Sequence, residues 1–319
     1  GLAVSARKYR RWSTKSRRLM TPRDESDMEP DFAGALEIIG ASGMKELAAI
    51  MREAPMSTQT IPQTPRDVRD LIRSGIWRGV TSGIAPGYLQ ANLVILPREL
   101  AFDFLLFCQR NPKPCPLLEV MEPGHTEPTL TAPGADIRTD VPGYRVYEEG
   151  QLVAEVESVM PYWQDDMVSF LLGCSFSFET AMVDGGIPLR HQENGANVAM
   201  YFTNIPTAPA GVFSGPMVVS MRPIKRRQIA RAVRISSRFP ATHGAPVHIG
   251  DPAAIGISDI ENPDFGDSVS VLAGEEPVFW ACGVTPQAVA LTCKPSLMIT
   301  HSPGRMFITD QRHADYSVL

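Results

Sequence analysis

Hydrophobic positions spaced one helical turn apart predict two helices between residues 65 and 111. The first covers residues 67–73. The second begins at Pro97, since proline suits the first position of a helix, and ends before Asn111-Pro112. Because the apolar residues of this second helix share one face, we expect it to pack against a hydrophobic core.

A different pattern follows in the middle of the chain. Two short runs on either side of Glu149-Gly150 predict a β-hairpin of strands 144–147 and 152–156. Beyond the hairpin, an apolar stretch interrupted by one glycine predicts a pair of helices, over residues 162–172 and 176–183.

In the C-terminal third, a short apolar strand runs four times into a polar residue and then a proline, over residues 217–223, 247–252, 278–286 and 297–303. Strands that alternate with helices imply a parallel or mixed sheet, in which ligands bind beyond the carboxyl ends of the strands. This arrangement would place four polar residues along one rim of the sheet: Arg222, Asp251, Cys282 and His301.

These patterns predict an α/β protein with a mixed or parallel sheet and flanking helices, plus a smaller α+β subdomain. We expect residues 1–64 to form a partly disordered N-terminal extension. The main α/β domain is expected to combine residues 65–120 with residues 205–313, and the subdomain to cover residues 121–204.

Composition narrows the class of protein. The 319 residues are 44% hydrophobic and carry a net charge of −5, which is typical of a soluble globular protein and excludes a wholly disordered chain. No apolar run approaches the roughly 18 to 20 residues that a membrane span needs. Residues 1–20 contain seven Arg or Lys and no acid, as in organellar transit peptides. We therefore expect a cytoplasmic protein, or a mitochondrial matrix protein if this leader is a transit peptide.

Motifs for cofactors and nucleic acids are absent from the sequence. The five cysteines form no C-x2-C pair, so we expect reduced thiols and no metal site. No P-loop, G-x-G-x-x-G or G-x-S-x-G is present, and we expect no cofactor and no nucleic-acid partner. Residues 194–250 hold seven Arg or Lys and no acid, which favours a small anionic substrate. We also expect a homo-oligomer.

Several residues could carry acid–base chemistry. His248 with Asp251 could act as base and orienter, and His301 or Glu179 as acid. Cys282 precedes a predicted helix, and a helix N-terminus lowers the pKa of a thiol, which would favour a thiolate. Each of these side chains could equally have a structural role.

Arg222 is our first candidate for binding a substrate carboxylate, because a guanidinium at a strand end can hold a carboxylate with two hydrogen bonds. The helix that starts near Thr285 would add backbone N–H groups to this clamp. The remaining candidates for substrate contact are Cys174, Ser175, Asn204 and Gly283.

Six sequence strings together point to a known family: PRELAFDFLLFCQRNPKPCPLLE, LLGCSFSFE, NIPTAPAGVFSGPMVVSMRP, SRFPATHGAPVHIGDPAAIGI, PVFWACGVTPQA and THSPGRMFITD. Over residues 65–312 the chain resembles a bacterial hydro-lyase family that is similar to the N-terminal half of mitochondrial D-glutamate cyclase. The resemblance implies a two-part α/β fold and a lyase that removes water from a small carboxylic acid. In the cyclase, D-glutamate loses water to become 5-oxo-D-proline; the resemblance covers the N-terminal half of that enzyme, and we expect this chain to lack the second half.

Two classes of function follow. The first is a hydro-lyase that acts on a small carboxylic acid, with D-glutamate cyclisation as one form of the reaction. In that variant Cys282 could serve as a covalent relay. The second is a non-catalytic protein that binds an amino or keto acid.

Overall fold

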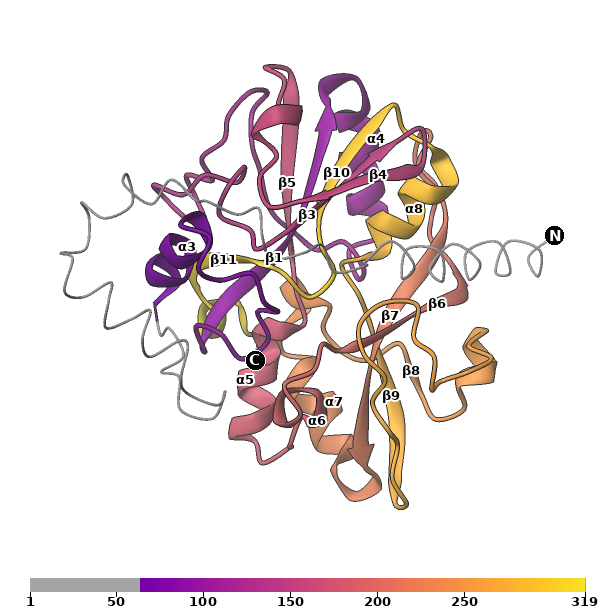
Figure 1. Ribbon diagram of the computed structural model, residues 1–319. Helices are drawn as coiled ribbons and strands as arrows, with labels where there is room; N and C mark the ends of the chain where they lie inside the picture. The colour runs from indigo at the N-terminus through magenta and orange to yellow at the C-terminus, as the bar shows by residue number, and fades with distance from the viewer. Residues whose placement is uncertain (1–63, 319) are drawn as a thin grey trace, which may run out of the picture. The chain divides into compact units, whose positions relative to one another are not determined.

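The computed structural model describes residues 64–318, in which two antiparallel sheets are surrounded by helices (Figure 1). The predicted leader and most of the predicted N-terminal extension lie outside the described residues. Among the described residues, no helix combines the length and the hydropathy that crossing a membrane requires.

The larger sheet has seven strands. Its order is β2-β5-β1-β10-β3-β4, and β11 also pairs with β1. Its strands are β1 (Tyr88–Pro97), β2 (Leu117–Val120), β3 (Tyr144–Glu148), β4 (Gln151–Val156), β5 (Met167–Gly173), β10 (Leu297–His301) and β11 (Phe307–Arg312). The β3–β4 pair is the predicted hairpin, and both turn residues, Glu149 and Gly150, have the positive φ that a tight hairpin turn needs.

The smaller sheet has the order β6-β7-β9-β8. Its strands are β6 (Ala199–Pro206), β7 (Pro216–Lys225), β8 (His248–Ile249) and β9 (Glu275–Ala281). Every strand pair in both sheets is antiparallel, so the predicted parallel pairing is wrong. The prediction assumed that consecutive strands joined by a helix lie side by side. Most strands here pair instead with strands distant in sequence, so the helix between two consecutive strands does not set the direction of pairing.

Six α-helices and five short 3-10 helices connect the described strands. The α-helices are α3 (Pro65–Arg73), α4 (Arg98–Arg110), α5 (Phe176–Asp184), α6 (Arg190–Glu193), α7 (Ile229–Ser236) and α8 (Thr285–Cys293). The 3-10 helices are η3 (Met160–Tyr162), η4 (Arg226–Gln228), η5 (Pro240–Thr242), η6 (Pro252–Ile255) and η7 (His313–Tyr316). Helices α3, α4 and α5 confirm the predictions for their segments, and α4 packs Phe104, Phe107 and Cys108 into the core.

The predicted helix over residues 162–172 is wrong, because most of this segment is strand β5. All seven residues of β5 are buried, and the strand lies between β2 and β1. A strand that is covered on both faces shows no polar alternation, so its sequence cannot be told from a buried helix by periodicity.

Strand β7 also differs from the prediction, because it continues through Arg222-Pro223 to Lys225. Strand β6 pairs with β7 only as far as Met221, so Pro223 lies beyond the last residue pair between these two strands. A proline without a backbone N–H is therefore tolerated inside this strand.

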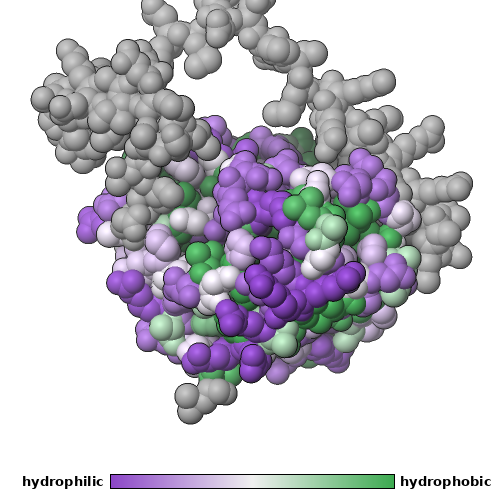
Figure 2. Space-filling view, turned by 90° about the horizontal axis from the view of Figure 1, so that it is seen from below, coloured by the Kyte–Doolittle hydropathy of each residue, from purple (hydrophilic) through white to green (hydrophobic). Residues whose placement is uncertain are grey.

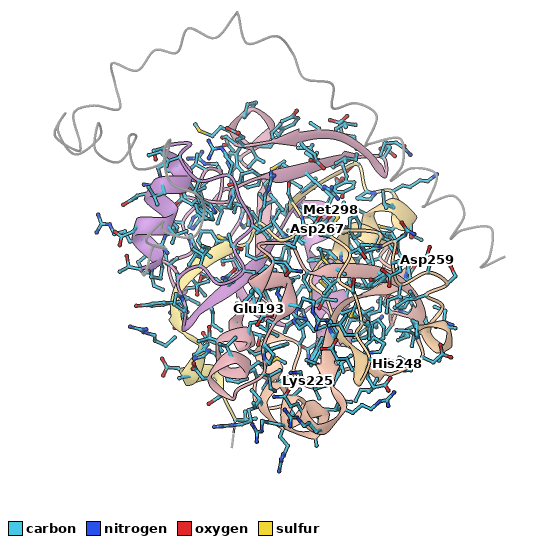
Figure 3. All side chains as sticks on the ribbon, turned by 60° about the horizontal axis from the view of Figure 1, so that its bottom comes forward. Glu193, Lys225, His248, Asp259, Asp267 and Met298 are labelled. Carbon is cyan, nitrogen blue, oxygen red and sulfur yellow. The ribbon has the colours of Figure 1, made fainter. Side chains whose placement is uncertain are left out.

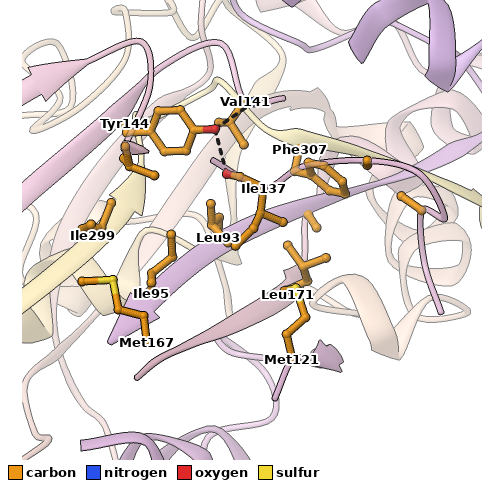
Figure 4. Close-up of a cluster of buried hydrophobic side chains, with 14 of the residues drawn as sticks. Leu93, Ile95, Met121, Ile137, Val141, Tyr144, Met167, Leu171, Ile299 and Phe307 are labelled. Atoms are coloured by element: carbon orange, nitrogen blue, oxygen red, sulfur yellow. Dashed lines mark hydrogen bonds between the residues drawn. The ribbon is translucent and has the colours of Figure 1, made fainter. Parts of the chain in front are cut away.

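A hydrophobic cluster covers one face of the larger sheet, where Leu93, Ile95 and Leu171 pack against the segment 121–141 (Figure 4). The hydroxyl of Tyr144 donates to the carbonyl of Ile137 and accepts from the Val141 amide, which satisfies the polar end of a buried ring.

A second cluster joins the two sheets, and we call it the junction cluster. Its buried members come from the ends of β5 and β9, the starts of α5 and α8, strands β6 and β7, and the residue before β11: Cys174, Phe176, Val198, Met200, Val218, Cys282, Val284, Ala288 and Met306. The junction cluster is where the two sheets meet, and it contains two of the predicted site residues.

The predicted domain boundaries at residues 120 and 204 stay a prediction. The larger sheet takes its strands from residues 88–173 and 297–312, and the smaller sheet from residues 199–281. Helices α6 and α7 lie on the lower side of Figure 1, and the face seen from that side is largely hydrophilic with smaller apolar areas (Figure 2).

Candidate active site at the junction of the two sheets

Two strand-to-helix turns bring Cys174 and Cys282 to the junction cluster. Cys174 lies between the end of β5 and the start of α5, and Cys282 lies between the end of β9 and the start of α8. The Cys174 thiol accepts a hydrogen bond from the Phe176 amide at 3.5 Å. Both thiols therefore face the N-terminal end of a helix.

Burial outweighs the helix N-terminus at both thiols. It raises the pKa of Cys282 to about 11, although the amides of Val284 and Gly283 and the charge of Arg222 act in the opposite direction. Burial likewise raises the pKa of Cys174 well above its usual value. Both groups are therefore protonated thiols at neutral pH, and the predicted thiolate at Cys282 is wrong for the protein without a ligand.

Asn92, on strand β1, holds the two turns together. Its amide nitrogen donates to the carbonyl of Gly173 at 2.8 Å and to that of Leu172 at 3.3 Å. A Cβ added to Gly283 would lie 1.9 Å from the same nitrogen. Gly283 is thus required for close packing against Asn92, and this requirement accounts for a glycine that was predicted to contact substrate.

Thr285 connects the start of α8 to strand β7. Its hydroxyl donates to the Cys282 carbonyl at 2.7 Å and accepts from the Val218 amide at 3.1 Å. The hydroxyl is therefore occupied by backbone groups.

Arg222 makes a buried ion pair with Glu179. Its Nε donates to Glu179 Oε1 at 2.9 Å, and its two terminal nitrogens donate to Ser175 Oγ at 2.9 Å and Ser220 Oγ at 3.0 Å. A second terminal hydrogen bond also reaches Glu179 Oε1. The guanidinium lies over the rings of Phe178 and Trp280. Four of its five N–H donors are thus engaged within the protein, so it has little capacity for a substrate carboxylate.

Glu179 is surrounded by further donors. His191 Nε2 lies 3.0 Å from its Oε1, while Gln192 Nε2 at 2.6 Å and Ser82 Oγ at 2.8 Å donate to its Oε2. Burial by itself would raise the Glu179 pKa, but His191 and Arg222 more than offset this and hold the pKa well below its usual range. The carboxylate has no proton to donate at neutral pH, which suits a counter-ion for Arg222 better than an acid.

His301 ends strand β10 and is buried beside β1. Its Nδ1 lies 3.2 Å from the Leu93 amide, from which it can accept a hydrogen bond, and 3.4 Å from the Leu93 carbonyl oxygen, to which it can donate one. Its Nε2 has no hydrogen-bond partner among the described residues. Burial, reinforced by the charge of Arg145, lowers the His301 pKa to about 4 even though the contact with the Leu93 carbonyl opposes the shift. His301 is therefore a buried neutral imidazole at neutral pH, with Nε2 available to a ligand.

His243 is a second buried histidine near the junction. It has a φ of 79°, and its Nδ1 donates to the Lys113 carbonyl at 2.7 Å, which leaves a lone pair on Nε2. This Nε2 too lacks a partner within the described part of the chain. Burial lowers the pKa of His243 to about 4, and the charge of Arg222 adds to the effect. Ala241 and Thr242, the two residues before His243, pack against Gly173, since a Cβ added to Gly173 would lie 1.8 Å from the Ala241 carbonyl oxygen.

His248 and Asp251 do not join this group. His248 Nε2 donates to the backbone carbonyl of Asp251 at 2.7 Å, and the Asp251 carboxylate instead accepts from the Ala253 amide and caps η6. His248 lies on edge strand β8, toward the periphery in Figure 3. Its ring contacts Phe279, which packs in one cluster with Met221. Because side chains alternate along a strand, Arg222 is on the opposite face of this sheet.

The expected single rim is therefore divided. Six of the predicted site residues come together at the junction: Cys174, Ser175, Glu179, Arg222, Cys282 and Gly283. His301 contacts Leu93, the residue that follows Asn92 on β1. Asn204 is exposed and lies against Gly256 at the end of η6. The catalytic and binding roles of all these residues stay predictions.

Three residues of the junction, Asn92, His191 and His243, were not among the predicted site residues. Two polar side chains, Gln90 and Asn92, interrupt the buried strand YLQANLVILP at a spacing of two. Buried polar residues on one face of an otherwise apolar strand are a signal for a polar site, and this signal was available in the sequence. Within residues 64–318, no group of three or more His, Cys, Asp or Glu side chains is arranged to hold a metal ion.

Comparison with known proteins identifies relatives over most of the chain. The family model of D-glutamate cyclase matches residues 168–310, which contain both junction thiols. A Geobacillus kaustophilus protein named "Putative hydro-lyase" is 60% identical over 262 residues, which cover 82% of this chain and all of that protein. A Bacillus subtilis protein of the same name is 60% identical over 255 residues, covering 80% of this chain and 99% of its own length.

One solved structure, a nitrogen repressor-like protein from Methanococcus jannaschii, covers 79% of this chain at 8% identity with a TM-score of 0.33. A likeness this weak carries no argument about fold or function. The sequence relatives are much closer, and on their identity and coverage the chain belongs to the hydro-lyase family that the D-glutamate cyclase model describes.

Proposed function

We propose that the protein is a lyase that removes water from a small carboxylic acid, and that its substrate is D-glutamate, which cyclises to 5-oxo-D-proline. The names of its relatives support a lyase of the hydro-lyase type in general. One observation supports the location of the reaction. Two thiols lie in the junction cluster, and the charge of Arg222 acts on both of them and on the buried ring of His243, whose Nε2 has no partner among the described residues.

The reaction moves two protons. The α-nitrogen of glutamate bonds to the γ-carboxyl carbon and one C–O bond breaks, so the two protons lost by the ammonium group are the two gained by the departing oxygen. We propose that the Cys282 thiol donates a proton to the departing oxygen, because a pKa of about 11 keeps this thiol protonated at neutral pH. We assign acceptance of the first ammonium proton to His243 Nε2, whose lone pair has no partner in residues 64–318. The imidazolium then gives its proton to the departing oxygen, which leaves as water, and the second ammonium proton restores the Cys282 thiol. The negative charge of a bound substrate would raise the low pKa of this imidazole.

The test is product formation by the purified full chain. D-glutamate, L-glutamate and small 2-hydroxy acids are each incubated with the protein, and 5-oxoproline or an alkene is followed by NMR. We expect 5-oxoproline from D-glutamate, and a loss of at least about 100-fold in rate for Cys282→Ser, since proton transfer by a placed side chain contributes roughly 10²- to 10⁴-fold.

The matched control is Cys293→Ser, at the opposite end of the same helix α8. It should retain the wild-type rate. If no substrate yields product while one of them raises the melting temperature, the protein is a binding protein for that acid and the lyase proposal is wrong. A Cys282→Ser variant with full activity would move the chemistry away from this thiol.

A further inference from the structure

Because Arg222 is occupied by Glu179, the carboxylate of a substrate needs another cation. The turn between β10 and β11, Ser302–Arg305, offers one. Arg305 is half-buried and makes no ion pair with any carboxylate in residues 64–318. We propose that Arg305 and Ser302 bind the carboxylate of an α-amino acid while Asn197 binds its ammonium group. The inference rests on the proposed function and names the residues that bind its substrate.

Two donors converge beside Gly143, which precedes strand β3. A Cβ built on Gly143 would lie 2.7 Å from Arg305 Nη1 and 3.2 Å from Ser302 Oγ. Ser302 is 5% exposed, and its hydroxyl has no hydrogen-bond partner among the described residues. An unpartnered buried hydroxyl beside an unpaired guanidinium is a suitable pair of donors for one carboxylate.

Positive charge extends from this point along the neighbouring strands. Arg145 lies on β3 opposite Thr300 of β10, and its Nη1 reaches the Gln287 side chain at 3.4 Å. His301, next to Ser302, adds a buried Nε2 that has no hydrogen-bond partner within residues 64–318. Arg145 is partly neutralised by Glu155 at 2.7 Å, whereas Arg305 has no such partner in the described chain. Arg305 is therefore the cation available to an anionic ligand.

Asn197 supplies the complementary acceptor on the other side of the turn. Its side chain lies against Gly304, where a Cβ would be 2.3 Å from Asn197 Oδ1. Its Nδ2 donates to the carbonyl of Pro303 at 3.1 Å, and because a carbonyl can only accept, the orientation of the amide is fixed. Asn197 Oδ1 is left as an acceptor that is buried and unpartnered in the part of the chain described.

The surroundings of Asn197 favour a cation at this acceptor. The carboxylate of Asp267 accepts from the backbone N–H of Asn197 at 2.8 Å, which places a negative charge next to this residue. Donors for an anion and an acceptor for a cation are thus separated by one four-residue turn. An α-amino acid carries both charges on neighbouring groups, whereas a hydroxy or keto acid lacks the ammonium.

The experiment compares binding of D-glutamate and glutarate, which has the same two carboxylates and no amine. Titration calorimetry is performed on the full chain and on Arg305→Met, Ser302→Ala, Asn197→Leu and Asn197→Asp, with Arg234→Met on the outer side of α7 as the control. Circular dichroism confirms that each variant is folded. Arg305→Met should weaken both ligands roughly 10-fold or more, since it removes a charge-assisted hydrogen bond. Arg234→Met should change neither.

Asn197→Leu should weaken D-glutamate by a similar factor and leave glutarate unchanged, and Asn197→Asp, which keeps an acceptor, should restore D-glutamate binding. Unchanged affinity in Arg305→Met overturns the carboxylate site, and equal loss of both ligands in Asn197→Leu overturns the ammonium site. If D-glutamate binds through these residues and no 5-oxoproline forms, the proposed function fails and the subsite stands. If product forms and Arg305→Met keeps kcat and KM, the subsite fails and the function stands.

Discussion

The side chains of Arg222 and Glu179 are each 1% exposed. Besides their ion pair, Arg222 donates to two serine hydroxyls, and Glu179 accepts from a serine and a glutamine side chain. In such a network the geometry of the guanidinium matters as much as its charge, because it supplies several N–H groups in one plane. The consequences can be tested one residue at a time.

Replacement of Arg222 by lysine should lower the free energy of unfolding by about 3 to 5 kcal/mol, the usual cost of disrupting one partner of a buried pair. Urea unfolding measures this change. Arg234→Lys, on the exposed side of α7, is the control and should change stability by less than about 0.5 kcal/mol. A stable Arg222→Lys protein that had lost only ligand affinity would restore Arg222 as the substrate clamp.

Two of the buried histidines, His243 and His301, should make the protein sensitive to acid. His243 and His301 have pKa values of about 4 in the folded protein and about 6.5 in the unfolded chain. Between these values the unfolded chain binds more protons, so stability is complete above about pH 6.5 and is lost as the pH falls toward 4. Each histidine contributes a slope of about 1.4 kcal/mol per pH unit at most.

Urea unfolding at pH 7, 6 and 5 measures that slope. In His243→Gln the slope between pH 6 and 5 should be smaller than in the wild-type protein by about 1 kcal/mol per unit. A slope that stays the same would mean that His243 is not buried as a neutral ring. Exposed His125 offers the control substitution, His125→Gln, which should leave the slope unchanged.

At the scale of elements, the junction depends on close approaches of backbone. Gly173 at the end of β5 faces the η5 turn, where a Cβ would lie 1.8 Å from the Ala241 carbonyl oxygen. Backbone cannot move aside as the end of a flexible side chain can, so strand and turn must separate.

Gly173→Ala should therefore destabilise the protein by about 1 to 3 kcal/mol, the range for an inserted group in a packed interior. Denaturant unfolding measures this loss. Gly79→Ala is the matched control, because the nearest atom to its added Cβ is an aromatic carbon of Trp77 at an ordinary 3.4 Å. Equal stability of the two variants would contradict the close packing of β5 on this turn.

Local pattern predicted some elements well and failed at others for a physical reason. Helix α4 and the β3–β4 hairpin carry their signals in their own residues, an apolar face and a tight turn. Strand β5 carries no such signal, because it is buried on both faces and a uniformly apolar run fits a strand or a helix. Only its pairing with β1 and β2 decides the conformation.

For the molecule as a whole, the junction cluster links the two sheets into one unit. Phe176 is part of this cluster, 5% exposed, and its ring stacks on His191. Removal of a buried aromatic ring costs about 3 to 5 kcal/mol.

Phe176→Ala should consequently lower the protection of backbone amides against hydrogen exchange in both sheets. Native-state hydrogen exchange should report the same loss of opening free energy for amides of β1 in the larger sheet and β7 in the smaller. Leu130→Ala, at a residue that is 71% exposed, is the control and should affect neither. Loss of protection confined to the smaller sheet would mean that the sheets unfold independently.

The sequence by itself determined the family, the helices with an apolar face and the residues able to carry chemistry, because these depend on residue type and local spacing. Only the tertiary structure decided which of them meet. Arg222 and His248 belong to strands β7 and β8, which pair with the two sides of β9, but strand alternation separates the two side chains onto opposite faces of the sheet. Arg222 pairs with Glu179, which is 43 residues away, and Asn197 meets Gly304 across more than 100 residues. Such contacts depend on how strands order and pair in space, which no local pattern of residues specifies.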